Sequence, residues 1–260
     1  MARKNVQRIL NCLPSQGQER DWLLEDARAA GALAAARIPV RKDLRQTWWA
    51  IGDQGETGSC VGWAAADSVL RWHFVQAGTL GKAEPLSVRF VWMAAKETDE
   101  FVGRPTTFIE SDGTSLKAAL DIARKYGAVA DELLPFGKGA HFPGRAETYN
   151  ATASRLRIAS YFNLDTDPAA WREWLAGNGP VLTRLDVDAT WDDATKTKGV
   201  LKRYQPSTAR GGHAVALVGY TADTFIVRNS WGTAWGDCGF AHASEAYAKA
   251  AFTEAYGVAV

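Results

Sequence analysis

The first half of the chain carries apolar residues at helical spacing. Residues 60–75 are mostly apolar and directly follow a glycine-rich stretch, residues 52–59, which predicts a long buried helix beginning at Cys60. Residues 115–126 place apolar side chains every three or four positions, and Gly127 is suited to end that helix. We expect a further helix over residues 87–96.

The second half changes to short β-like runs. Residues 221–223 form a polar break that suits a hairpin, and residues 168–176 are expected to form a short helix. Helices first and strands afterwards predict an α+β fold with two subdomains, residues 38–150 (helical) and 151–260 (β-rich). The four expected strands are residues 156–162, 181–185, 213–220 and 224–228.

Residues 1–37 form an N-terminal extension of a different character. Residues 19–37 are rich in Ala, Leu, Glu and Arg and favour a helix, which Ile38-Pro39 would end. Two interpretations stay open: a solvated helix that flanks the domain, or a short pro-segment that is removed or inhibitory.

Composition and charge exclude several classes of function. The 260 residues are 47% hydrophobic, enough for a packed core, and the formal net charge of +1 gives no electrostatic footprint for nucleic acid. The basic start, residues 1–10, lacks the apolar stretch of a secretion signal, and no run is long enough to cross a membrane. We therefore expect no nucleic-acid or membrane partner, and a protein that stays in a reducing cytoplasm or is exported without a cleaved signal.

Three cysteines and four histidines limit the chemistry that the chain can carry. A disulfide framework is excluded as the organising principle, and no cluster has the spacing of a metal site, so we expect neither metal nor cofactor. Cys12 is expected to be an exposed or flanking thiol, and Cys238 a buried or rim one. Core or surface roles are expected for three histidines that lack a partner pattern, namely His73, His141 and His242.

Cys60 stands where a reactive thiol is favoured. At the first position of a helix, free backbone N–H groups and the positive helix end stabilise a thiolate. Such a thiolate needs a partner that takes and returns a proton, and His213, at the start of an apolar run, is the candidate. Asn229 could hold the second ring nitrogen of His213, as the third member of a triad does.

These three blocks resemble those of the papain-like cysteine peptidases. The family pattern Q-x-x-x-G-S-C is matched by residues 54–60, H-A-[VL]-x-x-V-G-Y by residues 213–220, and N-S-W-G-x-x-W-G-x-x-G-[FY] by residues 229–240. Cys60 and His213 stand 153 residues apart, near the roughly 130–150 residues typical of such partners. The resemblance extends over residues 38–240 and implies a papain-like fold. Its β-rich subdomain would be antiparallel and barrel-like, and the active-site cleft would lie between the two subdomains.

The resemblance also implies a role for each side chain. Cys60 would be the nucleophile, His213 its general base and acid, and Asn229 the residue that orients His213. The side-chain amide of Gln54 and the backbone N–H of Cys60 would form the oxyanion hole, and Trp231 would cover the His213–Asn229 hydrogen bond. Substrate would be bound by Gly58, Ser59, Asp112, Gly113, Thr114, Gly212, Ala214 and Trp231.

Three positions depart from the family pattern. Val61 replaces a common tryptophan beside the nucleophile, and Thr57 stands where secreted members have a disulfide cysteine. Arg184 is expected either to reach the second substrate subsite or to lie on the surface of its strand.

Three activities fit this site. The first is hydrolysis of peptide bonds in a peptide or protein substrate through a thioester on Cys60. The second is a transpeptidase, ligase or amidase that uses the same acyl-enzyme, and the third is an idle fold used for binding. The intact set of Cys60, His213, Asn229 and Gln54 favours an enzyme, and residues 1–37 could inhibit it.

Overall fold

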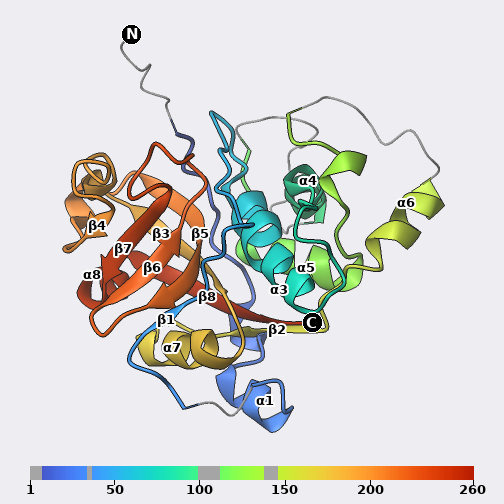
Figure 1. Cartoon of the computed structure of the whole chain (residues 1–260), viewed down its shortest axis with the longest axis horizontal. Coiled ribbons are helices and arrows are strands. Elements are labelled where there is room, and N and C mark those ends of the chain that lie inside the picture. The colour runs from blue at the N-terminus through green and yellow to red at the C-terminus, as the bar shows by residue number, and fades with distance from the viewer. Residues whose placement is uncertain (1–7, 34–36, 99–111, 138–145) are drawn as a thin grey trace.

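The computed structural model describes residues 8–33, 37–98, 112–137 and 146–260. His141 lies outside this part of the chain. Figure 1 shows the helices of residues 60–153 on one side of the molecule and most strands of the second half on the other, with α1 (Leu24–Ala29) below them. The predicted α+β class is therefore confirmed.

One continuous helical run begins at Cys60 and ends at Gln76. It consists of α2 (Cys60–Gly62), η2 (Trp63–Leu70), whose hydrogen bonds have π-helical spacing, and α3 (Arg71–Gln76). The run is buried over most of its length, and small residues at 64–66 let the neighbouring elements approach closely. The predicted central helix is confirmed.

The other helices of the first half pack around this run. Helices α4 (Val88–Thr98) and α5 (Leu116–Lys125) both contact it, and α6 (Ala146–Ala153) comes later in the chain. The Ser115 hydroxyl accepts the Ala118 N–H at 3.2 Å and caps α5. Gly127, with φ of 101°, follows its last turn in the left-handed region, so the predicted helix and its glycine end are confirmed.

The strands form one sheet in the order β2-β8-β3-β5-β6-β7-β4, with β1 paired to β5 beside this path. Every pair among the described strands is antiparallel except β4 with β7. The sheet is open, so the barrel-like description applies only loosely. The strands are β1 (Lys42–Asp43), β2 (Ser160–Asn163), β3 (Val181–Val187), β4 (Val200–Leu201), β5 (Gly211–Tyr220), β6 (Thr224–Arg228), β7 (Phe240–Ser244) and β8 (Phe252–Ala259).

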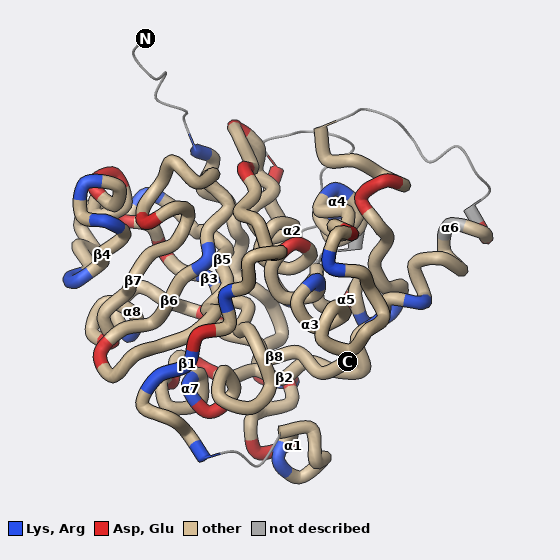
Figure 2. The backbone as a smooth tube through the Cα atoms, viewed as in Figure 1, with Lys and Arg blue, Asp and Glu red and all other residues tan. Residues whose placement is uncertain are grey.

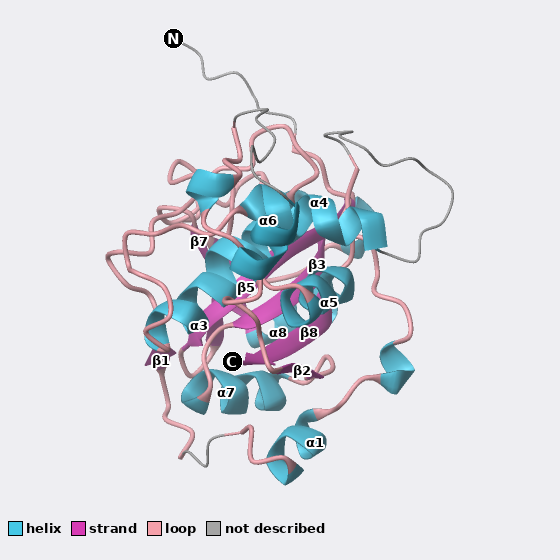
Figure 3. Cartoon of the chain, turned by 90° about the vertical axis from the view of Figure 1, so that its right-hand side faces the viewer, coloured by secondary structure: helices cyan, strands magenta, loops and turns pink. Residues whose placement is uncertain are grey.

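The central strand β5 is buried on both faces. Ala214, Ala216 and Val218 join the apolar cluster around the central helix, whereas Val215 and Leu217 join the cluster on the opposite face. This alternation follows from the two-residue period of a strand. Helices α7 (Pro168–Gly177) and α8 (Glu245–Ala251) contact the sheet, while the helices of the first half lie in front of it (Figure 3).

A buried ion pair fixes the central helix to the sheet. The guanidinium of Arg228, at the end of β6, donates to the Asp67 carboxylate at 2.5 Å and to the Ala50 carbonyl at 2.8 Å. Arg71 donates to the other Asp67 oxygen at 3.2 Å. Arg228 directly precedes Asn229 in sequence. The Asp67–Arg228 pair therefore ties the helix that starts at Cys60 to the segment that carries Asn229.

Three parts of the fold differ from expectation. In the described part of residues 19–37 the expected helix is reduced to α1 (Leu24–Ala29), preceded by a short 3-10 helix over Gln18–Arg20. Residues 22 and 23 pair with Asn163 instead of extending the helix. The strand expected over residues 156–162 begins only at Ser160, in β2. Strands β7 and β8 were not anticipated. Each contains two alanines, and β8 adds a glutamate and a glycine, residues of low β-propensity; burial rather than composition makes them strands.

Charged residues of both signs are interspersed along the described chain (Figure 2). The role of each charged residue therefore follows from the residues that it contacts. No described helix is both long enough and apolar enough to cross a membrane.

Candidate active site

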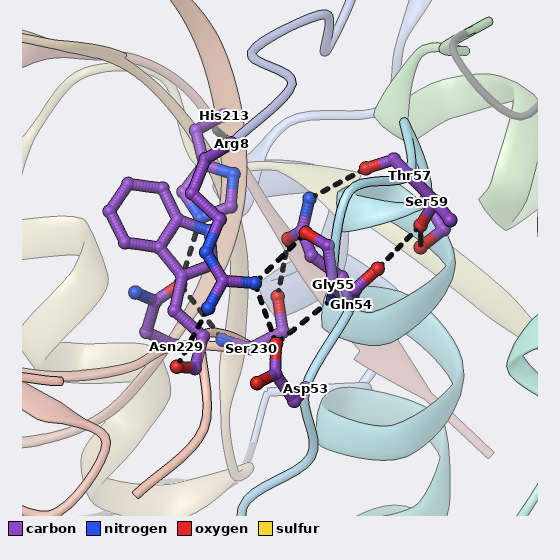
Figure 4. Close-up of polar contacts among 10 residues, drawn as sticks. Arg8, Asp53, Gln54, Gly55, Thr57, Ser59, His213, Asn229 and Ser230 are labelled. Atoms are coloured by element: carbon purple, nitrogen blue, oxygen red, sulfur yellow. Dashed lines mark hydrogen bonds and ion pairs between the residues drawn. The ribbon is translucent and has the colours of Figure 1, made fainter. Parts of the chain in front are cut away.

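The loop before the central helix places Cys60 at the helix start. Gly55 adopts a left-handed φ of 60° in this loop, and the Gln54 backbone N–H donates to the Ser230 carbonyl at 2.8 Å. The loop is thereby tied to the segment that carries Asn229. Ser59, predicted to bind substrate, is buried, and its hydroxyl lies 2.6 Å from that of Thr57 (Figure 4).

His213 lies at the start of β5, fully buried. Its Nε2 lies 2.8 Å from the Asn229 Oδ1 (Figure 4), and the same oxygen accepts the Ser230 N–H at 2.8 Å. The other ring nitrogen, Nδ1, is buried and has no oxygen or nitrogen partner in the described chain. The predicted link between His213 and Asn229 is therefore present, with Nδ1 left for the thiol.

Aromatic rings enclose the histidine. The Trp231 ring lies 4.9 Å from the imidazole centroid, and the Trp191 ring meets it edge-on at 5.6 Å. Trp235 stacks on Trp191 at 4.9 Å. These rings exclude water and account for part of the high tryptophan content of the chain.

The surroundings of Cys60 favour its thiolate. A hydrogen bond from the Cys12 thiol is the largest cause that lowers the pKa of Cys60, followed by the hydrogen bond and charge of His213 and the backbone N–H of Ala214. Burial opposes these effects, yet the pKa of Cys60 lies well below its ordinary value. The three elements that hold this thiolate are the central helix, β5 and the N-terminal extension.

The Gln54 side chain is held rigidly. Its amide oxygen accepts the Ser230 hydroxyl at 2.9 Å, and its amide nitrogen donates to the Thr57 carbonyl at 3.0 Å. An amide nitrogen has two hydrogens, so one is left for another acceptor. Gln54 is fully buried, and these two contacts show that its side chain stabilises the turn before Cys60.

The N-terminal extension runs through the site. The Cys12 N–H donates to the Gly212 carbonyl at 2.9 Å, and the Leu13 N–H donates to the Thr114 carbonyl at 3.0 Å. At Gly113 a Cβ would lie 1.9 Å from the carbonyl oxygen of Asn11, so only glycine permits this approach. The residues predicted to bind substrate at 112–114 and 212 thus line a groove that residues 11–13 already fill.

The expectation for Cys12 is wrong. We expected an exposed or flanking thiol, but Cys12 is 2% exposed and belongs to the same buried apolar cluster as Cys60. Cys12 is buried because the backbone of residues 12 and 13 pairs with both sides of the groove. Backbone hydrogen bonds leave no pattern of side chains in the sequence, so this burial could not be predicted. Cys238 is exposed.

Arg8 bridges the two walls of the site above this segment. Its guanidinium donates to the Asp53 carboxylate at 2.6 Å, to the Gly55 carbonyl at 2.9 Å and to the Trp231 carbonyl at 3.2 Å (Figure 4). The guanidinium also lies 5.7 Å from the centroid of the Trp231 ring. Sequence analysis missed Arg8, because one arginine in a short polar stretch carries no pattern.

Arg184 is buried beside the groove rather than exposed on its strand. Its Nε donates to the Cys12 carbonyl at 3.0 Å, and another nitrogen donates to the Thr253 hydroxyl at 2.6 Å. Nearby, the Glu254 carboxylate accepts the Ser15 N–H at 2.9 Å, and burial raises the pKa of Glu254. The interpretation that Arg184 reaches the groove fits this geometry better than a surface position.

The two other described histidines, His73 and His242, lie outside the site. His73 is buried in the central helix, and burial lowers its pKa to about 4. His242 lies 3.1 Å from the Asp237 carboxylate at the edge of the sheet. Core and surface roles are thus confirmed for these two residues.

A thiol-dependent hydrolase uses a cysteine, a histidine that acts on the thiol, and an asparagine that holds the histidine. Cys60, His213 and Asn229 are arranged in this way. The family model described as papain family cysteine protease matches residues 38–258. The chain therefore belongs to the papain family of cysteine proteases.

Individual relatives agree with this assignment. Cathepsin F of Drosophila melanogaster is 23% identical over 92% of this chain, which spans 40% of that protein. Among solved structures, xylellain, a cysteine protease from Xylella fastidiosa, has a TM-score of 0.77 at 20% identity and covers 100% of this chain and 99% of its own. Procathepsin L 3 of Tenebrio molitor has a TM-score of 0.67 at 17% identity and covers 97% of this chain and 77% of its own. At these identities the two structures establish the papain-like fold alone.

Proposed function

We propose that this chain is a cysteine peptidase that hydrolyses peptide bonds through a thioester on Cys60. The Cys60 thiolate attacks the scissile carbonyl carbon, and the tetrahedral intermediate collapses as His213 gives a proton to the leaving amine. Water, deprotonated by His213, then attacks the thioester and releases the acid. A peptide or protein that can reach the groove beside residues 112–114 is the substrate.

The observation that carries this proposal is the chain of contacts from Cys60 through His213 to Asn229. The thiol pKa is lowered at the helix start, and His213 contributes to that lowering. The opposite ring nitrogen is held by Asn229 at 2.8 Å. In this arrangement Asn229 is a positioning residue: it keeps the ring facing the sulfur and touches no reacting atom.

The oxyanion hole would use two donors. The backbone N–H of Cys60 lies at the first position of the helix, where it has no intrahelical partner. The free amide hydrogen of Gln54 is the second donor, on a side chain locked at both ends by Ser230 and Thr57. One such donor contributes roughly 3–4 kcal/mol of transition-state stabilisation.

The test uses a chain that begins at Arg37, so that the groove is open. We expect this chain to cleave members of a peptide library and to react with a peptidyl epoxide, and Cys60→Ala to do neither. Cys238→Ser is the matched control, because Cys238 is an exposed thiol away from the groove residues. Full cleavage by Cys60→Ala would refute the proposal. An added amine that diverts the acyl group would show a transferase instead.

We further propose that residues 8–33 keep the enzyme latent. Residues 11–13 pair with both walls of the groove, and Arg8 joins the two walls above them. Further along, the Lys117 ammonium pairs with the Asp21 carboxylate, and the Trp22 carbonyl accepts the Asn163 N–H at 2.7 Å. A substrate therefore has to displace a segment that is anchored at several points.

A further inference from the structure

The two buried cysteines of the described chain both lie at the active site. Cys12 and Cys60 are 2% and 0% exposed and belong to one buried apolar cluster, and each thiol shifts the pKa of the other. Cys12 is fixed by its own backbone, because its N–H donates to the Gly212 carbonyl at 2.9 Å and its carbonyl accepts from Arg184 at 3.0 Å. Cys12 is therefore held in the groove beside Gly212, the residue that precedes His213.

The two thiols differ in character. Burial, together with the hydrogen bond to Cys60, raises the pKa of Cys12, whereas the pKa of Cys60 is lowered. The charged groups that act on Cys12 are Arg184, which lowers its pKa, and Glu254, which raises it. Cys60 is thus the thiolate of the pair and Cys12 the protonated neighbour, as in a nucleophilic and a resolving thiol.

We propose that Cys12 is a resolving cysteine, and that oxidation by hydrogen peroxide links Cys12 to Cys60 in a reversible disulfide that locks the N-terminal extension across the active site. The regulatory meaning of this lock rests on the proposed peptidase function of Cys60. The disulfide itself depends only on where the two sulfurs lie.

The reaction balances in two steps. The Cys60 thiolate attacks one peroxide oxygen, the O–O bond breaks, and Cys60 becomes a sulfenic acid while hydroxide leaves and takes up a proton as water. The Cys12 sulfur then attacks the Cys60 sulfur, its thiol proton goes to the departing hydroxide, and a second water leaves. The two thiols lose two electrons in total, and one peroxide is reduced to two waters.

Such a lock would protect the nucleophile. A sulfenic acid without a neighbouring thiol proceeds to sulfinic acid, which ordinary thiols do not reverse. With Cys12 buried in the same cluster as Cys60, a disulfide can form before further oxidation, and a dithiol reductant returns both thiols by exchange. Proteolytic loss of the extension would remove Cys12, so the open enzyme would lose this protection.

The test treats the full chain with two equivalents of hydrogen peroxide in a Cys238→Ser background, enough to take a lone thiol to the sulfinic acid. We expect the intact mass to fall by two hydrogens, a non-reducing digest to yield the Cys12–Cys60 peptide pair, and a dithiol to restore both thiols. Cys12→Ser should instead gain two oxygens on Cys60 and not recover with the dithiol. Cys12→Ala repeats the comparison should the serine variant fold poorly.

The outcomes separate this inference from the proposed function. Linked peptides are detected by mass and need no peptidase activity. A disulfide in the full chain, together with no cleavage by the open chain that begins at Arg37, would therefore support the lock and refute the peptidase. Sulfinic acid on Cys60 of the chain that retains Cys12, at the same rate as in Cys12→Ser, would overturn the inference. Treatment with peroxide that leaves Cys12 and Cys60 as free thiols would also overturn the inference.

Discussion

Replacing Arg8 by alanine should partly release the proposed latency of the enzyme. The Arg8 guanidinium touches both walls of the site, through Asp53 and Gly55 on one side and the Trp231 carbonyl on the other. The alanine side chain makes none of these contacts. The rest of the extension, including the pairing at residues 11–13, is left unchanged.

The magnitude follows from the exposure of the partners. The Asp53 side chain is 53% exposed, so this ion pair contributes only about 0.2–1 kcal/mol. The two hydrogen bonds from the guanidinium to carbonyl oxygens are part-buried and, at about 0.5–1.5 kcal/mol each, bring the total to about 1.2–4 kcal/mol. Loss of that amount raises the open fraction roughly 8- to 900-fold, with the rate of a chain that starts at Arg37 as the ceiling.

The assay is the initial rate of peptide hydrolysis by the full chain, with intact mass recorded afterwards to confirm that the extension is still attached. Arg20→Ala is the matched control, because Arg20 lies in the same extension, is 86% exposed and contacts only the Glu19 carboxylate in an ion pair at 3.5 Å. An unchanged rate for Arg8→Ala beside a faster Arg37 chain would refute the role of Arg8. Equal rates for the full and the Arg37 chains would remove inhibition altogether.

Three further changes test other parts of the account. Gln54→Ala in the open enzyme should lower kcat about 10²- to 10³-fold with little change in KM, the cost of one oxyanion donor; a loss below threefold in steady-state kinetics would contradict this role. Asp67→Ala should lower the free energy of unfolding by about 3–5 kcal/mol in denaturant titrations, because the buried Arg228 guanidinium loses its counter-charge, and a change below 1 kcal/mol would contradict it. Cys12→Ala should raise the pKa of Cys60, because the Cys12 hydrogen bond is the largest cause that lowers it. The ultraviolet absorbance of the Cys60 thiolate, followed against pH, should then have a higher midpoint. Cys12→Ser keeps a hydrogen-bond donor and should shift this midpoint less.

The sequence was informative wherever side chains carry a pattern. The glycine-rich stretch before Cys60, the apolar run after His213 and the block after Asn229 each constrain local backbone and chemistry together. The structure brings Gln54, His213 and Asn229 into one hydrogen-bonded set. Those residues could be predicted, because motif spacing fixes which loops and strands must meet.

The N-terminal extension could not be predicted in the same way. Its contacts at Cys12 and Leu13 use backbone N–H groups, and any residue except proline supplies such a donor. The Asp67–Arg228 pair joins residues 161 positions apart, with no local signal in either. These features depend on tertiary proximity, which a single sequence does not reveal.

The measurement that tests the central claim most directly is detection of the acyl-enzyme. An open chain that begins at Arg37 is mixed with a peptide ester, quenched in acid, and weighed intact. The account predicts a mass increase equal to the acyl part, mapped by digestion to Cys60 and absent in Cys60→Ala. Turnover of the ester without any adduct on Cys60, and with Cys60→Ala equally active, would contradict it.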